Sequence, residues 1–188
     1  MTIDPAALWI ALGAAFLLGV ATIAVRTLLR GGKISSTRGR VLHQRIRSWA
    51  ILVPALLVPI LLGPVTLKLG AGALGLICFR EFSRATGLFR ERVVTILVQL
   101  SIVALTGVSL SGVDGLWTTA VPLLALVIVA GALFDDRPAG YVQRVALGVL
   151  SFLLFGVCLG HLGLLADQLE TRRIILWLLL CISLNDVA

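Results

Sequence analysis

The feature that most constrains this chain is a series of apolar blocks separated by short charged segments. Residues 6–25, 93–110 and 145–165 contain no Asp, Glu, Lys or Arg. A run of about 18 or more mostly apolar residues with few charges is typical of a membrane-spanning helix. The sequence therefore predicts an all-α fold, a polytopic transmembrane helix bundle.

The composition supports the same class of protein. Hydrophobic residues make up 59% of the 188 residues and charged residues 13%, with a mean hydropathy of +1.08. Soluble domains are about half apolar and about a quarter charged, so this chain has too few charges for a water-facing surface of ordinary size. The net charge of +7 lies in the gaps between apolar blocks, which indicates membrane topology and anionic lipid headgroups rather than nucleic acid.

We expect about seven spans, the last of them truncated at the end of the chain. Their predicted ranges are 6–29, 49–62, 64–79, 93–110, 116–133, 145–165 and 174–188. The second and third blocks are short, and Pro54 and Pro59 interrupt the second. They fit two kinked spans better, with a re-entrant pair as the alternative. Three regions follow: an N-terminal helix (1–29), a basic linker (30–48) and the main membrane bundle (49–188).

The basic residues predict the orientation. One side of the membrane receives seven Lys or Arg from 26–47, four from 80–92 and two from 137–144, whereas the other receives Lys68, Arg172 and Arg173. Because cytoplasmic loops carry the excess of Lys and Arg, the N-terminus is expected outside and the basic loops in the cytoplasm. Residues 41–49 resemble a basic amphipathic segment that leads into the membrane and contacts anionic lipid, although they could equally be a topology anchor.

Several potentially reactive residues have a structural interpretation. Cys78, Cys158 and Cys181 lie inside apolar blocks without CxxC spacing, so packed thiols are expected rather than a metal site or disulfide. His161 lies in the sixth block, where a polar packing role is favoured over catalysis. The glycines at 70, 72 and 75 and at 156, 160 and 163 place small residues on helix faces, which favours close helix packing.

Two carboxylates have an open role. Glu81 directly follows an apolar block, and it is either an interfacial ion pair or a functional residue. Asp186 follows Arg173 by 13 residues, roughly 20 Å of helix, whereas the hydrocarbon core is about 30 Å thick. A carboxylate at that depth costs about 2.5–3.5 kcal/mol and normally faces a cavity, a partner or a metal. Asn185 beside it also needs polar partners. The alternative is that the seventh helix ends early.

Three features in order resemble the phosphatidate cytidylyltransferase (CDP-diacylglycerol synthase) family. The segment HQRIRSW at 43–49 precedes a proline-containing apolar helix, REF at 80–82 follows the third block, and SLNDVA at 183–188 resembles the start of an Asn-Asp-x-Ala-x-Tyr motif. The resemblance covers about 42–188. The first helix also resembles an additional span of one bacterial branch, which implies a bacterial inner membrane.

The resemblance implies that CTP and phosphatidic acid are converted to CDP-diacylglycerol and pyrophosphate, with Mg²⁺ as cofactor. It makes Asp186 a metal ligand, directly or through water, and Glu81 and Asn185 supporting polar residues. A homodimer is also compatible with it. The family's acidic and basic C-terminal signature is absent from these residues, so no complete catalytic set is expected and the chain is interpreted as an inactive N-terminal fragment. The alternative is a small complete membrane protein acting as a transporter or assembly scaffold.

Overall fold

The computed structural model describes most of the chain from residue 58 to residue 167. The described residues are 13, 19, 20, 23, 27, 54, 58–113, 115–135, 140–167, 174, 175, 177, 178 and 181. The chain divides into two compact units, of which one is Pro64–Asp167 and the other combines Met1–Gly63 with Gln168–Ala188. No strand occurs among these described residues, and the predicted all-α class is confirmed.

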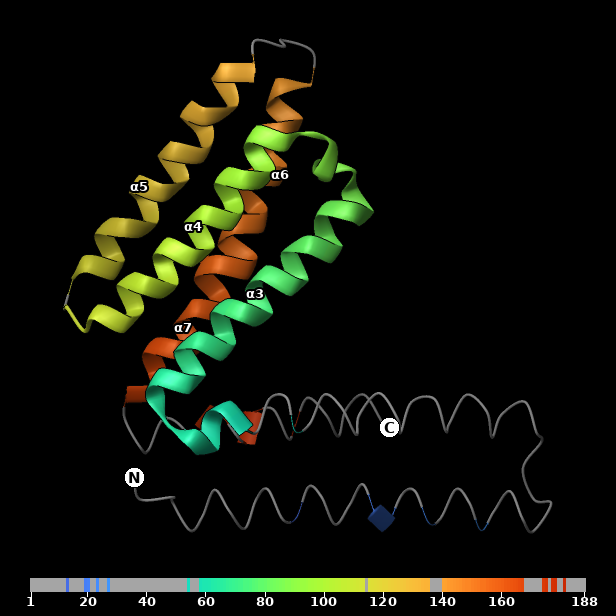
Figure 1. The fold of residues 1–188 in the computed structure, drawn as a ribbon, viewed down its shortest axis with the longest axis vertical. Helices are drawn as coiled ribbons and strands as arrows, with labels where there is room; N and C mark the ends of the chain where they lie inside the picture. Colours follow the sequence, from blue (N-terminus) through green and yellow to red (C-terminus); the bar gives the residue numbers. More distant parts are fainter. Residues whose placement is uncertain are drawn as a thin grey trace. The chain divides into compact units, whose positions relative to one another are not determined.

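The unit Pro64–Asp167 is a bundle of antiparallel helices (Figure 1). Its elements, in chain order, are α3 (Pro64–Thr86), the 3₁₀ turn η1 (Leu88–Arg90), α4 (Arg92–Ser111), α5 (Leu116–Gly131), the 3₁₀ turn η2 (Ala132–Asp135), α6 (Tyr141–Ser151), the π-helical segment η3 (Phe152–Cys158), α7 (Leu159–Leu164) and the 3₁₀ turn η4 (Leu165–Asp167). The segments α6, η3 and α7 follow one another without a break.

Helix α4 lies at the centre of this unit, in contact with α3, α5, α6, η3 and α7. Its buried apolar residues recur every three or four positions, as a helix with one core-facing stripe requires. These are Val94, Val98, Ile102 and Leu105. The stripe packs against Phe79 of α3, Trp117 and Ile128 of α5, and Phe152 of η3, which form one apolar core.

Three helices are long and apolar enough to cross a membrane: Arg92–Ser111, Leu116–Phe134 and Tyr141–Leu164. They confirm the predicted blocks at 93–110 and 116–133. The sixth helix begins at Tyr141, four residues before the predicted start. Helix α3 is 23 residues long, but Lys68, Arg80 and Glu81 interrupt its apolar character. The count of seven spans stays a prediction, because most of the remaining blocks lie outside the described residues.

The glycines of α3 and α7 permit close helix packing, as the sequence predicts. A Cβ atom on Gly75 would collide with the backbone oxygen of Phe155, and one on Gly163 would lie 3.2 Å from Cα of Lys68. A Cβ on Gly160 would collide with the ring of Trp117. Gly75 and Gly163 thus bring backbones together, and Gly160 makes room for an aromatic ring, where a larger residue would separate the helices.

Candidate functional site

Arginine side chains gather at one end of the Pro64–Asp167 unit. Helix α3 ends there, and α4 and α6 begin there (Figure 1). The arginines are Arg80, Arg84, Arg90, Arg92 and Arg144. Within this unit's described residues, the opposite end carries a single Lys or Arg, namely Lys68. The fold therefore separates the charges as the orientation argument expects, with 80–92 and 144 on one side and Lys68 on the other.

Glu81 lies on the exposed face of α3 at this end. Its Oε1 atom is 3.7 Å from Nη1 of Arg84, and the two side chains are 68% and 56% exposed. Exposed ion pairs of this kind contribute little to stability. The structure thus provides the ion pair that was one of the two interpretations of Glu81, while a supporting role in catalysis stays a prediction.

The predicted metal ligand Asp186 and its neighbour Asn185 lie outside the described residues. Among the residues that are described, no group of three or more His, Cys, Asp or Glu side chains could hold a metal ion. Glu81 is therefore not part of a carboxylate cluster within the described bundle, and the predicted Mg²⁺ site rests on the sequence.

A buried ion pair at the arginine end was missed by the sequence interpretation. Nη1 of Arg144 lies 3.7 Å from Oε2 of Glu91, and the side chains are 8% and 24% exposed. Arg144 directly precedes the predicted sixth block, but α6 begins at Tyr141 after the left-handed Gly140, so Arg144 lies inside the helix. The buried stripe of α6 consists of Arg144, Gly148 and Ser151, so extending the helical spacing backwards from Gly148 would have placed Arg144 inside.

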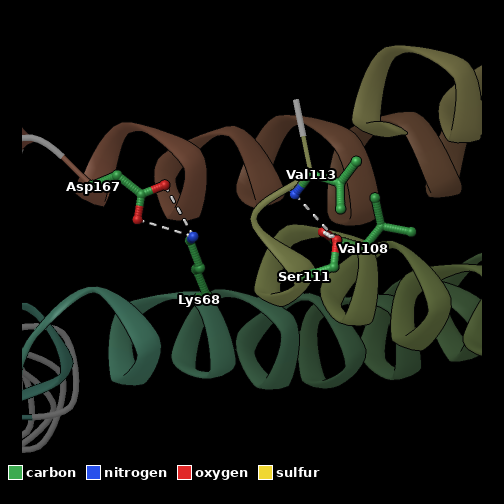
Figure 2. A network of polar contacts seen from close by, with 5 residues as sticks. All are labelled: Lys68, Val108, Ser111, Val113 and Asp167. Atoms are coloured by element: carbon green, nitrogen blue, oxygen red, sulfur yellow. Dashed lines mark hydrogen bonds and ion pairs between the residues drawn. The ribbon is translucent and has the colours of Figure 1, made fainter. Parts of the chain in front are cut away.

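A third ion pair lies at the opposite end of the unit (Figure 2). Nζ of Lys68 lies 2.9 Å from Oδ1 and 3.0 Å from Oδ2 of Asp167. Lys68 is 8% exposed and Asp167 is 54% exposed, so the lysine is the buried partner. The contact joins the start of α3 to η4, after α7. It lies far along α3 from Arg80, and we assign it a structural role.

His161 and the cysteines have packing or surface environments. The His161 ring lies edge-on to Trp117 at 5.5 Å between centroids, and its Nδ1 is 2.9 Å from the carbonyl oxygen of Val157. These contacts agree with a packing role. All three cysteines are free, and Cys78 is half-buried. The expectation of packed thiols is wrong for Cys158 and Cys181, whose side chains are exposed.

A groove between α3 and α4 has Arg80 in its lining and was not predicted. Its volume is about 400 Å³. The lining residues are Leu76, Ile77 and Arg80 of α3 with Ile96, Gln99, Leu100 and Val103 of α4. Five of these seven side chains are aliphatic, and the two polar ones are Arg80 and Gln99. The sequence contains a hint, because Gln99 is the one amide side chain in α4, but only the packing of two helices brings Gln99 and Arg80 into the same groove.

These features define a class: a helical, membrane-type protein whose basic groups concentrate at one end of an apolar bundle. The model of the cytidylyltransferase family matches residues 43–188, most of the chain, and the chain belongs to this family. The resemblance noted for 43–49, 80–82 and 183–188 falls within the matched range. Comparison with curated proteins and with solved structures gave no significant match.

Proposed function

We propose that this chain is part of a membrane-bound nucleotidyltransferase that converts CTP and phosphatidic acid to CDP-diacylglycerol and pyrophosphate in phospholipid biosynthesis. The observation that carries the proposal is the family match over 43–188, which makes CTP the expected nucleotide. Three helices long and apolar enough to cross a membrane support a lipid as the acceptor, because its acyl chains would remain in the bilayer.

In the proposed reaction, a phosphate oxygen of phosphatidic acid attacks the α-phosphorus of CTP. The bond from that phosphorus to the bridging oxygen breaks, and pyrophosphate leaves. Positively charged groups are needed because both reactants are anionic. Mg²⁺, with Asp186 as a ligand, would neutralise the triphosphate. The arginine end of the bundle supports placing the phosphates on that side.

The proposed location is a bacterial inner membrane, with the N-terminus outside and the arginine end in the cytoplasm. The charge separation between Arg80–Arg92 and Lys68 supports this orientation, because basic residues are retained on the cytoplasmic side. CTP would then reach the arginine end from the cytoplasm, and phosphatidic acid would reach it from the inner leaflet.

We assign the activity to the whole protein, and we expect residues 1–188 by themselves to be inactive. Nucleotidyl transfer through two metal ions needs several carboxylate ligands. Asp186 is the single strong candidate in this sequence. Glu81 is exposed and paired with Arg84.

The test is product formation by the protein expressed from its complete reading frame. It would be placed in phosphatidic acid vesicles with labelled CTP and Mg²⁺, and labelled CDP-diacylglycerol and pyrophosphate would be measured. The proposal expects one pyrophosphate per lipid product. A folded protein that neither binds CTP nor forms either product would contradict it and favour a transporter or scaffold. Turnover by residues 1–188 alone would contradict the assignment to the whole protein.

A further inference from the structure

We propose that the groove between α3 and α4 binds one anionic phospholipid from the bilayer, with an acyl chain along its aliphatic wall and the phosphate at Arg80. The inference deepens the proposed function. Lipid binding in the groove is argued independently of that function, and only the link between this lipid and catalysis rests on it. All seven lining residues belong to the Pro64–Asp167 unit, so the groove is complete within that unit.

The wall of the groove suits a hydrocarbon chain. Ile77 is 61% exposed, Leu100 is 59% exposed and Ile96 is 53% exposed, although each lies in a helix of the apolar bundle. Large aliphatic side chains exposed along a membrane-type helix face lipid rather than water. The volume of about 400 Å³ falls within the range of about 300–1,000 Å³ that is usual for ligand pockets.

Arg80 marks the boundary between the apolar and polar parts of α3. Residues 69–79 contain no charged side chain, and Arg80 is the first charge after them. Its guanidinium can hold a phosphate through two parallel hydrogen bonds. No carboxylate lines the groove. The ion pairs among the described residues are Lys68–Asp167, Arg84–Glu81 and Arg144–Glu91, and none of them includes Arg80. Gln99 from α4 adds an amide that can donate to the same headgroup.

Two further arginines lie one helical turn beyond the lining residues. Arg84 follows Arg80 by four positions on α3, and Arg92 precedes Ile96 by four positions on α4. Residues four apart share a helix face, so Arg84 and Arg92 lie on the same helix faces as the lining residues Arg80 and Ile96, towards the end at which α3 ends and α4 begins. Positive charge at one end and aliphatic side chains along the rest match the two parts of an anionic phospholipid.

The test uses the full chain in phosphatidylcholine nanodiscs without CTP, so that lipid binding is measured separately from turnover. The probe is phosphatidic acid with a photoreactive group on one acyl chain, and mass spectrometry locates the crosslinks. We expect crosslinks on α3 and α4 within the groove. Unlabelled phosphatidic acid should compete, whereas glycerol 3-phosphate should not. Equal labelling by a photoreactive phosphatidylcholine, or equal competition by glycerol 3-phosphate, would overturn the proposal.

Two variants with matched controls locate the binding. Arg80→Gln should weaken labelling by about tenfold or more, the effect of losing a charged hydrogen bond. Arg90→Gln should leave it unchanged, because Arg90 lies over the ring of Phe89 in η1 and does not line the groove. Leu100→Trp should block the groove, whereas Leu126→Trp should not, since Leu126 is an exposed residue of α5.

The outcomes separate this inference from the proposed function. Unchanged labelling in folded Arg80→Gln and Leu100→Trp proteins would overturn the groove even if CDP-diacylglycerol is formed. Groove labelling that both variants lose would support the inference even if no CDP-diacylglycerol is formed. Elution as a single species in detergent would show that each variant is folded.

Discussion

Gly75 of α3 lies directly against the backbone carbonyl of Phe155, which belongs to the π-helical segment η3. The side chain of Phe155 continues the contact, with its ring 5.4 Å from the ring of Phe82 on α3. A π-helical turn widens the helix and changes the direction of its carbonyls. Here the widened turn lies opposite Gly75, so the backbone of α3 comes into contact with the backbone of the long helix Tyr141–Leu164.

Gly75→Ala should therefore destabilise the bundle by about 1–3 kcal/mol, because the new methyl group meets a backbone oxygen that can move only with its helix. The measurement is thermal unfolding of the purified protein in detergent. Gly107→Ala on α4 is the matched control, since no atom lies within 4 Å of its Cβ position. The control should be neutral or slightly stabilising. Equal stability of the two variants would contradict the close contact.

Arg144→Gln should lower the free energy of unfolding by up to about 3 kcal/mol, because it leaves the carboxylate of Glu91 half-buried without its ion-pair partner. Adding Glu91→Gln should recover part of the loss. A double-mutant cycle should therefore give a coupling energy of about 1 kcal/mol or more. The exposed pair Glu81 and Arg84 provides the comparison, and its cycle should give close to zero. Similar coupling in the two pairs would contradict the difference in burial.

Substitutions of Lys68 and Asp167, the ion pair at the other end of the unit, should lower the melting temperature by different amounts. Asp167→Asn removes the carboxylate from Lys68, which is 8% exposed, so the ammonium stays in the bundle without its counter-ion. Lys68→Met leaves only Asp167, which is 54% exposed and can be hydrated. We therefore expect the melting temperature to fall further for Asp167→Asn than for Lys68→Met. The reverse order would show that Lys68 reaches water by moving its side chain.

Asp186→Asn should reduce turnover of the whole protein by about 100-fold or more and raise the Mg²⁺ concentration needed for half-maximal rate, because an amide is a poorer ligand for a hard cation. Removal of Mg²⁺ with a chelator should abolish turnover reversibly. The readout is CDP-diacylglycerol formation across a Mg²⁺ titration. An unchanged Mg²⁺ requirement in the variant would exclude Asp186 as a ligand.

Much of the fold was predictable, because a long apolar helix can be recognised from the hydrophobicity of consecutive residues alone. The length of the apolar runs alone predicts the helices at 93–110 and 116–133. The glycines at 72, 75, 160 and 163 predict that neighbouring helices pack closely. Arg144 shows where this reasoning failed. This charge directly precedes the predicted start of the sixth block at residue 145, whereas the helix begins at Tyr141 and buries the Arg144 side chain.

The sequence by itself determined the all-helical class, the apolar blocks, the charge asymmetry and the family motifs, since each of these depends on neighbouring residues or on simple spacing. Only the tertiary structure decided which distant residues meet. Glu91 pairs with Arg144, Lys68 pairs with Asp167, and Arg80 and Gln99 line one groove, although the members of each pair are far apart in the sequence. Their proximity depends on helix rotation and on packing at glycines, and helical periodicity specifies the buried face of a helix without specifying its neighbour.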